Sequence, residues 1–239
     1  IPTLKYEDFL KYHEEYYHPS NSYIYIYGDM DVNERLEYLD REYLSDFDVS
    51  DVDIHANIER QAAFDKPVYE TKPYAITEDE SLEDNTYLSY NAVIGTSVDA
   101  KLYLAFQILD YALVMTPGAP VKQALLDAGI STDVYSSYET SLYQPVYSIV
   151  AKNSNSKEQD RFVSVINDTL EKLVKDGINE RTIEAGINYY EFKYREADYG
   201  PYPKGLMYYL TMMDSWLYDE TKPFIHIEAG DTFDELKKN

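Results

Sequence analysis

The apolar positions in the first 45 residues predict two helices with a strand between them. Residues 4–17 carry an apolar stripe at helical spacing, and Pro19 ends the helix because proline cannot continue it. Residues 22–27 place isoleucine on one face and tyrosine on the other, which predicts a strand. Asp31 and Glu34 form an acidic capping box and predict that a second helix begins there.

The periodicity fades after residue 45. Aspartates alternate with apolar residues near the start of this stretch, and Pro67 and Pro73 lie near its end. Such a composition is typical of a connection between folded parts. We therefore expect residues 46–73 to be an acidic linker between two units.

A second unit follows, in which the spacing of the apolar residues predicts both strands and helices. Residues 86–95 read as a strand and residues 98–115 as a largely apolar helix. Residues 116–152 then predict a short amphipathic helix and two strands, with Gly129 as a left-handed cap that a Cβ would hinder. This stretch holds no nucleophile with a base, no metal-ligand set and no phosphate loop, so we interpret it as a platform rather than a reaction centre.

Three further helices are predicted toward the C-terminus. Ser156 and Gln159 form a capping box for the first, which Gly177 ends. Asn179 caps the second, and Pro203 suits the first turn of the third. The order of strand, helices, hairpin and helices predicts an α+β fold, with helices packed on one face of a sheet.

Charge and composition narrow the classes of partner. The 239 residues contain 44 acidic and 21 basic side chains, a net charge of −23, which disfavours nucleic acid and anionic membranes as partners. There is no cysteine, which excludes disulfides and thiol catalysis and fits a reducing interior. No apolar run approaches the roughly 20 residues of a membrane span. We find no signal peptide and expect a cytoplasmic location, and the opening Ile1-Pro2 without methionine predicts a fragment.

Two patterns in the sequence resemble metal sites but lack the spacing or the ligands that such sites need. His13 and His18 are five residues apart, so on a helix they point about 140° apart, whereas zinc-binding histidines four residues apart differ by about 40°. We expect packing for His13 and a turn contact for His18. His55 and His226 are isolated, and the aspartates at 46, 48, 51 and 53 lack the glycine and final glutamate of a calcium loop.

Three stretches together resemble the insulinase/pitrilysin clan of zinc metallopeptidases, most closely its presequence-protease branch. They are YYHPSNSYIYIYGD at 16–29, TPGAPVKQALLDAGISTDV at 116–134 with the later Gln144-Pro145, and a third group near the C-terminus. The third group consists of Glu191, Arg195, Glu196, Gly200, Pro203, Gly205 and Trp216. The resemblance implies a mostly antiparallel sheet with helices on one face, preceded by a partial copy of the same unit.

The resemblance also implies that different domains of a longer polypeptide have different roles. In that clan, homologous domains form two bowl-shaped halves around an unfolded peptide, and zinc lies in the first domain on an H-x-x-E-H helix, which is absent here. Residues 1–45 would then end the catalytic-type first domain, and residues 74–239 would form an inactive second domain, truncated at its C-terminus. We expect no catalytic residue, metal or cofactor in this chain, and zinc in the intact parent.

The C-terminal signature is interpreted as structural. Arg195 and Glu196 lie beside a helix break, where we expect an ion pair that fixes residues 200–205. Gly205 is expected to allow close helix approach, and Trp216 is expected to anchor the core. Arg195 and Tyr199 are not assigned a role in catalysis.

One strand is a candidate peptide contact. In insulinase-like enzymes an edge strand of the second domain pairs with the end of the substrate, and the matching residues here are Asp133, Val134, Tyr135, Ser136, Ser137 and Tyr138. Serines 136 and 137 stand where the family often has glycine, and an ordinary sheet edge is the alternative interpretation.

The sequence thus predicts a non-catalytic part of a peptidase, which forms a wall of the chamber and contacts unfolded peptide. Its partners would be the rest of the same polypeptide and that peptide. Two alternatives stay open at this point: a structural subunit of the same clan, and a stand-alone peptide-binding module.

Overall fold

The computed structural model describes residues 2–48 and 58–238. The chain divides into two compact units, residues 1–59 (unit 1) and residues 60–239 (unit 2), and each is described by itself. Part of the predicted linker, including Asp51, Asp53 and His55, lies outside the described residues.

The described part of unit 1 contains two helices and two short 3₁₀ turns. Helix α1 spans Tyr6–Tyr16 and α2 spans Val32–Glu42, with the turns at Pro19–Asn21 and Leu44–Asp46. The side chain of Asp31 accepts a hydrogen bond from the backbone N–H of Glu34 at 3.1 Å, so the predicted cap of α2 is confirmed.

The strand predicted at residues 22–27 is wrong. Ser22 has the φ and ψ of extended backbone, but the three strands of the described sheet all lie in unit 2. The alternation of side chains favours an extended conformation, whereas a strand also needs a neighbouring strand, which the described part of unit 1 does not supply. Neither α1 nor α2 contains a buried residue, so their apolar faces enclose no core.

Unit 2 contains a three-stranded antiparallel sheet. The strands are β1 (Thr86–Val93), β2 (Asp133–Glu139) and β3 (Val146–Ser154), in the order β1-β3-β2. Tyr138 of β2 lies opposite Tyr147 of β3, and Asn91 of β1 lies opposite Ser148. The predicted strands and the α+β class are confirmed.

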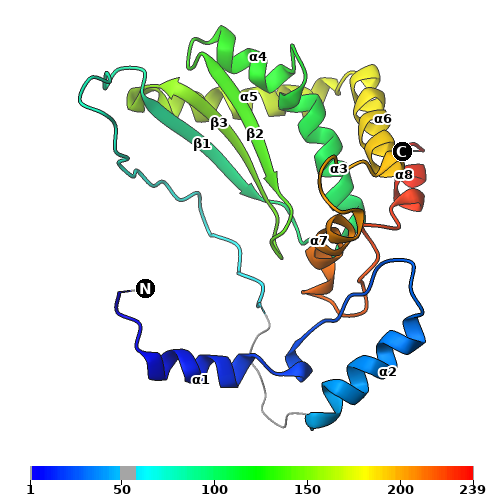
Figure 1. Cartoon of the computed structure of the whole chain (residues 1–239). Helices are drawn as coiled ribbons and strands as arrows, with labels where there is room; N and C mark the ends of the chain where they lie inside the picture. The colour runs from blue at the N-terminus through cyan, green and yellow to red at the C-terminus, as the bar shows by residue number, and fades with distance from the viewer. Residues whose placement is uncertain (1, 49–57, 239) are drawn as a thin grey trace. The chain divides into compact units, whose positions relative to one another are not determined.

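Among the helices of unit 2, α3, α4 and α5 cover one face of this sheet, and Figure 1 shows α5 running behind the strands. The bounds of the unit 2 helices are α3 Ala100–Asp110, α4 Pro120–Asp127, α5 Gln159–Asp176, α6 Glu180–Glu196, α7 Lys204–Trp216 and α8 Gly230–Leu236. A π-helical turn, Tyr111–Met115, follows α3 directly. Helix α8 has no counterpart among the elements predicted from the sequence.

Alternate residues of the strands build the main core. Leu88, Val134, Ile149 and Ala151 point to the covered face and are buried together with Phe162 of α5. The same cluster contains Leu113 and Val114 of the π turn, and Val121 and Leu125 of α4. The opposite face of the sheet stays open, so the strands show the period-two burial of a sheet covered on one side.

The caps at the helix ends agree with those predicted from the sequence, with two exceptions. Gly129 and Gly177 adopt positive φ at the ends of α4 and α5, and the side chain of Asn179 accepts from Arg181 N–H at 3.0 Å. Residues 156–158, however, form a 3₁₀ turn, and α5 starts at Gln159 with no side-chain cap. Pro203 precedes α7 as its N-cap residue rather than occupying its first turn.

Residues 100–127 form the one described helical stretch long and apolar enough to cross a membrane by length and composition. Leu104, Ile108, Val114 and Val121 within it are buried in unit 2. The stretch is also divided by the π turn and by the loop at 116–119. It therefore has the character of a core helix of unit 2.

Helix α6 packs very closely on α3 at Gly186. A Cβ added there would lie 3.2 Å from Ile108 Cγ2 and from Tyr111 Cδ1, and 3.3 Å from the carbonyl oxygen of Ile108. A carbonyl inside a helix cannot move aside as a side-chain end can. The approach of the two helices thus depends on the absence of a side chain at this position.

We expect Gly186→Ala to lower the free energy of unfolding by about 1 kcal/mol, because overpacking outweighs the gain in helix propensity. Urea denaturation followed by circular dichroism measures this. Gly230→Ala is the control, since nothing lies within 4 Å of the added Cβ in α8. Equal or greater stability of Gly186→Ala would contradict the close contact.

Candidate functional site

Strand β2 is an outer strand of the described sheet. It pairs with β3 along its whole length, from Asp133 opposite Lys152 to Glu139 opposite Val146. Among the described residues, β2 makes no backbone–backbone hydrogen bond outside the sheet, and at its first residue the N–H and C=O of Asp133 bond to the Ser131 hydroxyl at 3.0 and 2.6 Å. Alternate N–H and C=O groups of an outer strand point away from its neighbour, where an extended peptide can pair with them.

The six residues predicted as peptide contacts divide between the two faces of β2. Asp133, Tyr135 and Ser137 are exposed on the open face, and the side chain of Tyr135 has 44% of its surface exposed. Val134 is fully buried, and Ser136 and Tyr138 are half-buried on the covered face. Only three of the six side chains are thus available to a ligand.

The open face carries small polar groups at its centre. Ser89 and Ser148 both donate hydrogen bonds to the side-chain oxygen of Asn91, at 2.8 and 2.7 Å. Ser137 lies opposite Ser148 in the same cross-strand row. Tyr135 lies in the next row, opposite Val150, and both Tyr135 and Tyr87 are exposed. The face is therefore of mixed polarity, without a charged cluster at its centre.

A buried carboxylate lies beneath β2. Asp110, the last residue of α3, has 6% of its surface exposed and accepts a hydrogen bond from the Tyr147 hydroxyl at 2.8 Å. Burial raises the pKa of Asp110, and Ser136 and Tyr147 act in the opposite direction. Burial and the Asp110 charge also raise the pKa of Tyr147. The hydrogen bond from Tyr147 links α3 to β3 under the sheet.

A second polar group lies near the end of β2. Tyr103 of α3 donates to the Asp214 carboxylate of α7 at 2.7 Å, and Thr140 donates to the same oxygen at 3.4 Å. Burial raises the pKa of Asp214 and, together with the charge of Asp99, raises that of Tyr138 to about 12. The hydroxyl of Tyr138 is buried without a hydrogen-bond partner in the described structure.

His226 also belongs to this second polar group, through its contact with Tyr103. Its ring stacks on Tyr103 with centroids 3.9 Å apart, and its Nε2 lies 2.8 Å from the carbonyl oxygen of Ser97, to which the Nε2–H tautomer donates. Burial lowers the pKa of His226 to about 4. The residue that looked isolated in the sequence is therefore a buried neutral histidine, which packs the segment after α7 against α3 and Ser97.

Side chains fasten the loop between β2 and β3 to two other parts of the chain, in addition to its backbone bonds to Ile94 and Ser97. Tyr218 stacks on Tyr143 and donates to the carbonyl oxygen of Ser141 at 2.8 Å. The Gln144 side chain accepts from Gln61 N–H at 2.7 Å and donates to the Gln61 carbonyl oxygen at 3.2 Å. The loop thus holds both the region after α7 and the start of unit 2.

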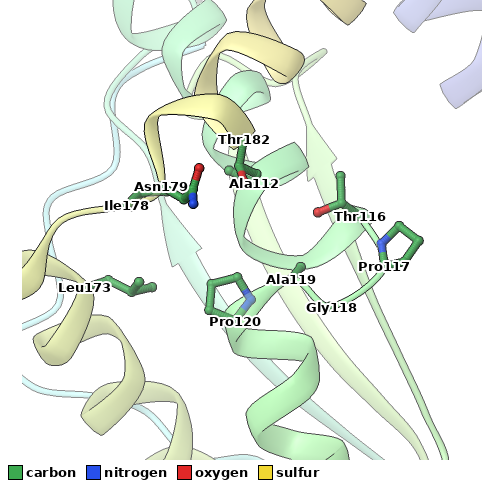
Figure 2. Close-up of a pocket in the computed structure, with 10 residues that line it drawn as sticks. All are labelled: Ala112, Thr116, Pro117, Gly118, Ala119, Pro120, Leu173, Ile178, Asn179 and Thr182. Atoms are coloured by element: carbon green, nitrogen blue, oxygen red, sulfur yellow. The ribbon is translucent and has the colours of Figure 1, made fainter.

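A separate cavity of about 320 Å³ lies beside the TPGAP stretch (Figure 2). The loop at 116–120 forms one side, and Leu173, Ile178, Asn179 and Thr182 from the ends of α5 and α6 form the other. Its polar groups are two threonine hydroxyls and one amide. No titratable side chain lines it, so it lacks the acid–base groups expected of a hydrolytic site.

The signature residues near the C-terminus lie in and after α6. Arg195 donates to Glu191 one turn earlier, at 3.0 and 2.7 Å, and Lys237 contacts the other Glu191 oxygen at 2.7 Å. Arg195 thus forms an ion pair, as expected, but the pair lies within α6 because the spacing of four residues favours Glu191, and it does not join residues 200–205. Hydrogen bonds from Lys237 and Arg195 lower the pKa of Glu191.

The remaining signature residues have structural positions. Gly200 has a φ of +59° and its N–H donates to Asp198 at 2.9 Å, in the turn before α7. Glu196 ends α6, Gly205 is in the first turn of α7, and Trp216, half-buried, ends α7. The structure does not bring these residues together with β2 into one site.

The described residues contain no group of three or more His, Asp or Glu side chains that could hold a metal ion. His13 is exposed and stacks on Tyr17. His18 accepts from Ser20 N–H at 3.2 Å, so its predicted turn contact is confirmed.

The Peptidase M16 inactive domain family matches residues 3–190, and the chain belongs to this family. The chain is 43% identical over 237 residues to Protein HypA of Clostridium perfringens and 33% identical over 239 residues to Presequence protease 1 of Arabidopsis thaliana, covering 99% of this chain in both cases. It spans 24% and 22% of those two proteins, about a quarter of their length. The resemblance to the presequence-protease branch is confirmed.

Solved structures show a looser likeness. An M16-like peptidase of Alicyclobacillus acidocaldarius matches with a TM-score of 0.49 and 18% identity, covering 99% of this chain and 52% of that one. The inactive peptidase domain of a zinc protease from Bordetella parapertussis matches with a TM-score of 0.48 and 12% identity, covering 63% of this chain and 82% of that one.

The buried polar residues beneath β2 were not predicted from the sequence. Asp110 had a signal, because it is the only charged residue in the apolar run from 102 to 121. An acidic residue within a helix of otherwise apolar character marks either an end of the helix or a buried carboxylate. Asp214 and Tyr103 had no such signal, since they meet only through the tertiary fold.

We expect the stability of the protein to fall as the pH drops from about 6.5 to about 4. Above this range His226 is neutral in both the folded and the unfolded chain. Within it, the unfolded chain takes up a proton that the folded chain excludes, which costs at most about 3 kcal/mol. Urea unfolding at several pH values measures the effect.

His226→Gln is the matched control, because glutamine also donates a hydrogen bond but does not titrate. The difference between the two proteins isolates His226 from Asp110 and Asp214, whose raised pKa values act in the opposite sense. A pH dependence that is the same in both proteins would show that His226 is not responsible.

Proposed function

We propose that this chain is the non-catalytic part of a longer zinc metallopeptidase that degrades unfolded peptides. In this proposal unit 2 forms part of the chamber wall and holds an extended stretch of peptide along β2. The observation that carries it is the position of β2 as an outer strand beside an open sheet face, in a chain of the Peptidase M16 inactive domain family. An outer strand offers backbone groups to any extended sequence, which suits a peptidase that acts on diverse peptides.

The division of the chain is part of the proposal. Unit 1 would end the catalytic-type domain, and unit 2 would be the inactive second domain. This is supported by the helices α1 and α2, which have apolar residues such as Phe9, Leu10 and Leu36 exposed and bury none. An apolar helix face is stable when another element covers it, which the rest of the same polypeptide would supply.

Zinc and the catalytic residues would lie in that remaining polypeptide. The lack of cysteine fits a reducing compartment, so a cytoplasmic location is retained in the proposal. A structural role without proteolysis is the alternative, and the coding sequence before Ile1 separates the two: an H-x-x-E-H motif supports a peptidase, and its absence supports a structural subunit.

We expect an unstructured peptide of about 20–30 residues to bind along β2. Backbone amide NMR of the labelled chain should show shifts concentrated on Asp133–Tyr138 and on Ser148 and Val150, because pairing at an edge changes the amides of that strand and its neighbour. Tyr135→Ala, an exposed position, should weaken binding several-fold through lost contact area.

The control ligand is the same peptide with proline at alternate positions, which removes the N–H groups that pair with an edge. Equal binding of the two peptides would exclude β-pairing. An absence of shifts at millimolar peptide would mean that this part of the enzyme is scaffold only.

We also expect the purified chain to hydrolyse no peptide and to retain no stoichiometric zinc after gel filtration. The reason is that no metal-ligand group exists among the described residues. Cleavage of an internally quenched peptide, with and without chelator, and metal analysis by mass spectrometry test this. Chelator-sensitive cleavage that co-purifies with the chain would contradict the proposal.

A further inference from the structure

We propose that residues 62–73 are a tethered strand that pairs with the open edge of β1 and covers it. This stretch has no part in peptide binding as proposed above. Only one consequence rests on the proposed function: a covered β1 leaves β2 as the single edge of the described sheet that peptide can reach.

The outer edge of β1 has no partner strand in the described structure. β1 pairs with β3 on one side only, because the order of the sheet is β1-β3-β2. Its eight residues, Thr86–Val93, span about 24 Å. The backbone groups that point away from β3 along this length are those that a further strand would bind. Such an edge pairs readily with an extended chain unless another element covers it.

The first anchor of the tethered stretch lies at the end of β1. The side-chain amide of Gln144 binds both backbone groups of Gln61, accepting from its N–H at 2.7 Å and donating to its carbonyl oxygen at 3.2 Å. The carbonyl oxygen of the next residue, Pro145, accepts from the N–H of Ile94 at 2.8 Å, and Ile94 directly follows β1. Gln61 is therefore held near the end of β1.

The second anchor lies at the start of β1. The hydroxyl of Tyr74 donates to the side-chain oxygen of Asn85 at 2.6 Å, and Asn85 directly precedes β1. The Tyr74 ring also meets Tyr87 edge to face, with centroids 5.7 Å apart. Between the two anchors the chain therefore travels the length of β1 in the opposite direction. Figure 1 draws this stretch in cyan on the side of β1 away from β3.

The stretch between the anchors is long enough to lie along the whole edge. Tyr74 follows Gln61 by thirteen residues, which reach about 43 Å when extended, against about 24 Å for β1. Residues 62–73 form no backbone–backbone hydrogen bond among the described residues, and Val68 and Tyr69 are both more than 60% exposed. The spare length lets the stretch approach and leave the edge while both anchors stay in place.

The sequence of residues 62–73, AAFDKPVYETKP, suits an outermost strand. Phe64, Val68 and Tyr69 favour extended backbone. Pro67 lacks an N–H and is tolerated in a strand where that group would point away from the neighbour. The two lysines belong to the charges that natural proteins place on outer strands to prevent further pairing. A strand of this composition covers β1 without offering a good edge in turn.

Pro67 also determines which residues of the stretch would bind β1. In an antiparallel pair, alternate residues turn their N–H and C=O groups toward the neighbouring strand, and the others turn them away. Because Pro67 suits an outward position, Val68 and the other even-numbered residues would bind β1 through their N–H groups. Tyr69 would share the outward position of Pro67.

We expect slow amide exchange at alternate residues of this stretch. In hydrogen-exchange NMR of the full chain, the even-numbered amides from Phe64 to Glu70 should exchange about tenfold more slowly than the odd-numbered ones, after correction for the intrinsic rate of each residue. The reason is that only the even-numbered N–H groups are hydrogen-bonded. Exchange at the rate of an unfolded peptide throughout residues 62–72, or slowing without alternation, would overturn the proposal.

Two proline variants are matched to this pattern. Val68→Pro removes an N–H that binds β1 and should abolish the slow exchange of the remaining even-numbered amides. Tyr69→Pro removes an outward N–H and should preserve it. Both side chains are exposed, so neither change removes core packing. Equal loss of slow exchange in the two variants would exclude pairing with the edge.

Gln144→Ala tests the first anchor separately. Without the Gln144 amide, residue 61 is no longer held at the end of β1, so the effective concentration of the strand at the edge falls and the slow exchange should weaken several-fold. Gln123→Ala on α4 is the control, because its side chain bonds to Asp127. Equal exchange in Gln144→Ala and the unmodified chain would overturn the role given to this anchor.

Peptide binding separates this proposal from the proposed function. If both hold, peptide shifts the amides of β2 in the unmodified chain, and those of β1 as well in Val68→Pro, where the edge of β1 is open. If no peptide binds to either protein, the proposed function fails, while hydrogen exchange still decides the role of residues 62–73. Peptide that shifts β1 equally in both proteins would show that residues 62–73 do not cover this edge.

Discussion

The pairing of β3 with a strand on each side is the constraint on which unit 2 depends. Tyr147, Ile149 and Ala151 of this strand are buried, and both β1 and β2 take their register from it. The helices α3, α4 and α5 cover only one face, so each strand presents alternate residues to the core and to the open side. The exposure of β2 as an edge is a direct result of this order.

The helices impose a second constraint from beneath the sheet. The close contact at Gly186 places α6 against α3, and α3 carries both Tyr103 and Asp110 to the underside of β2. Polar groups that would be costly in isolation are therefore grouped at the two ends of one helix. The sheet is supported from beneath partly by the hydrogen bond from Tyr147 to Asp110 and not by apolar packing alone.

Much of unit 2 was predictable from the sequence because its signals are local. Each helix cap, at Gly129, Gly177 and Asn179, depends on a few neighbouring residues. The alternation of apolar and polar residues in the strands is equally local. The edge position of residues 133–138 came from the family resemblance rather than from periodicity, and the order β1-β3-β2 was not predicted. The wrong prediction of a strand at residues 22–27 shows the limit of local signals. Alternating side chains favour an extended backbone, but they do not show whether a neighbouring strand is present.

The candidate site was harder to predict for the same reason. Ser136, Tyr147 and Asp110 are distant in sequence and meet only when the sheet packs on α3. Helix α8 was missed because the sequence GDTFDEL contains only two large apolar residues, of which Phe233 is buried between α3 and α6. Its stability comes from that contact rather than from its own pattern.

Two open strand edges in one small sheet carry a risk of self-association, because β1 or β2 of one molecule can pair with an edge of another. The excess of 23 negative charges opposes such encounters by repulsion between like molecules. Dissolved salt screens this repulsion, with a Debye length of about 8 Å at physiological ionic strength. The outer strand edges therefore make the colloidal stability of the isolated chain dependent on its acidic surface, and this stability is lowest in concentrated salt.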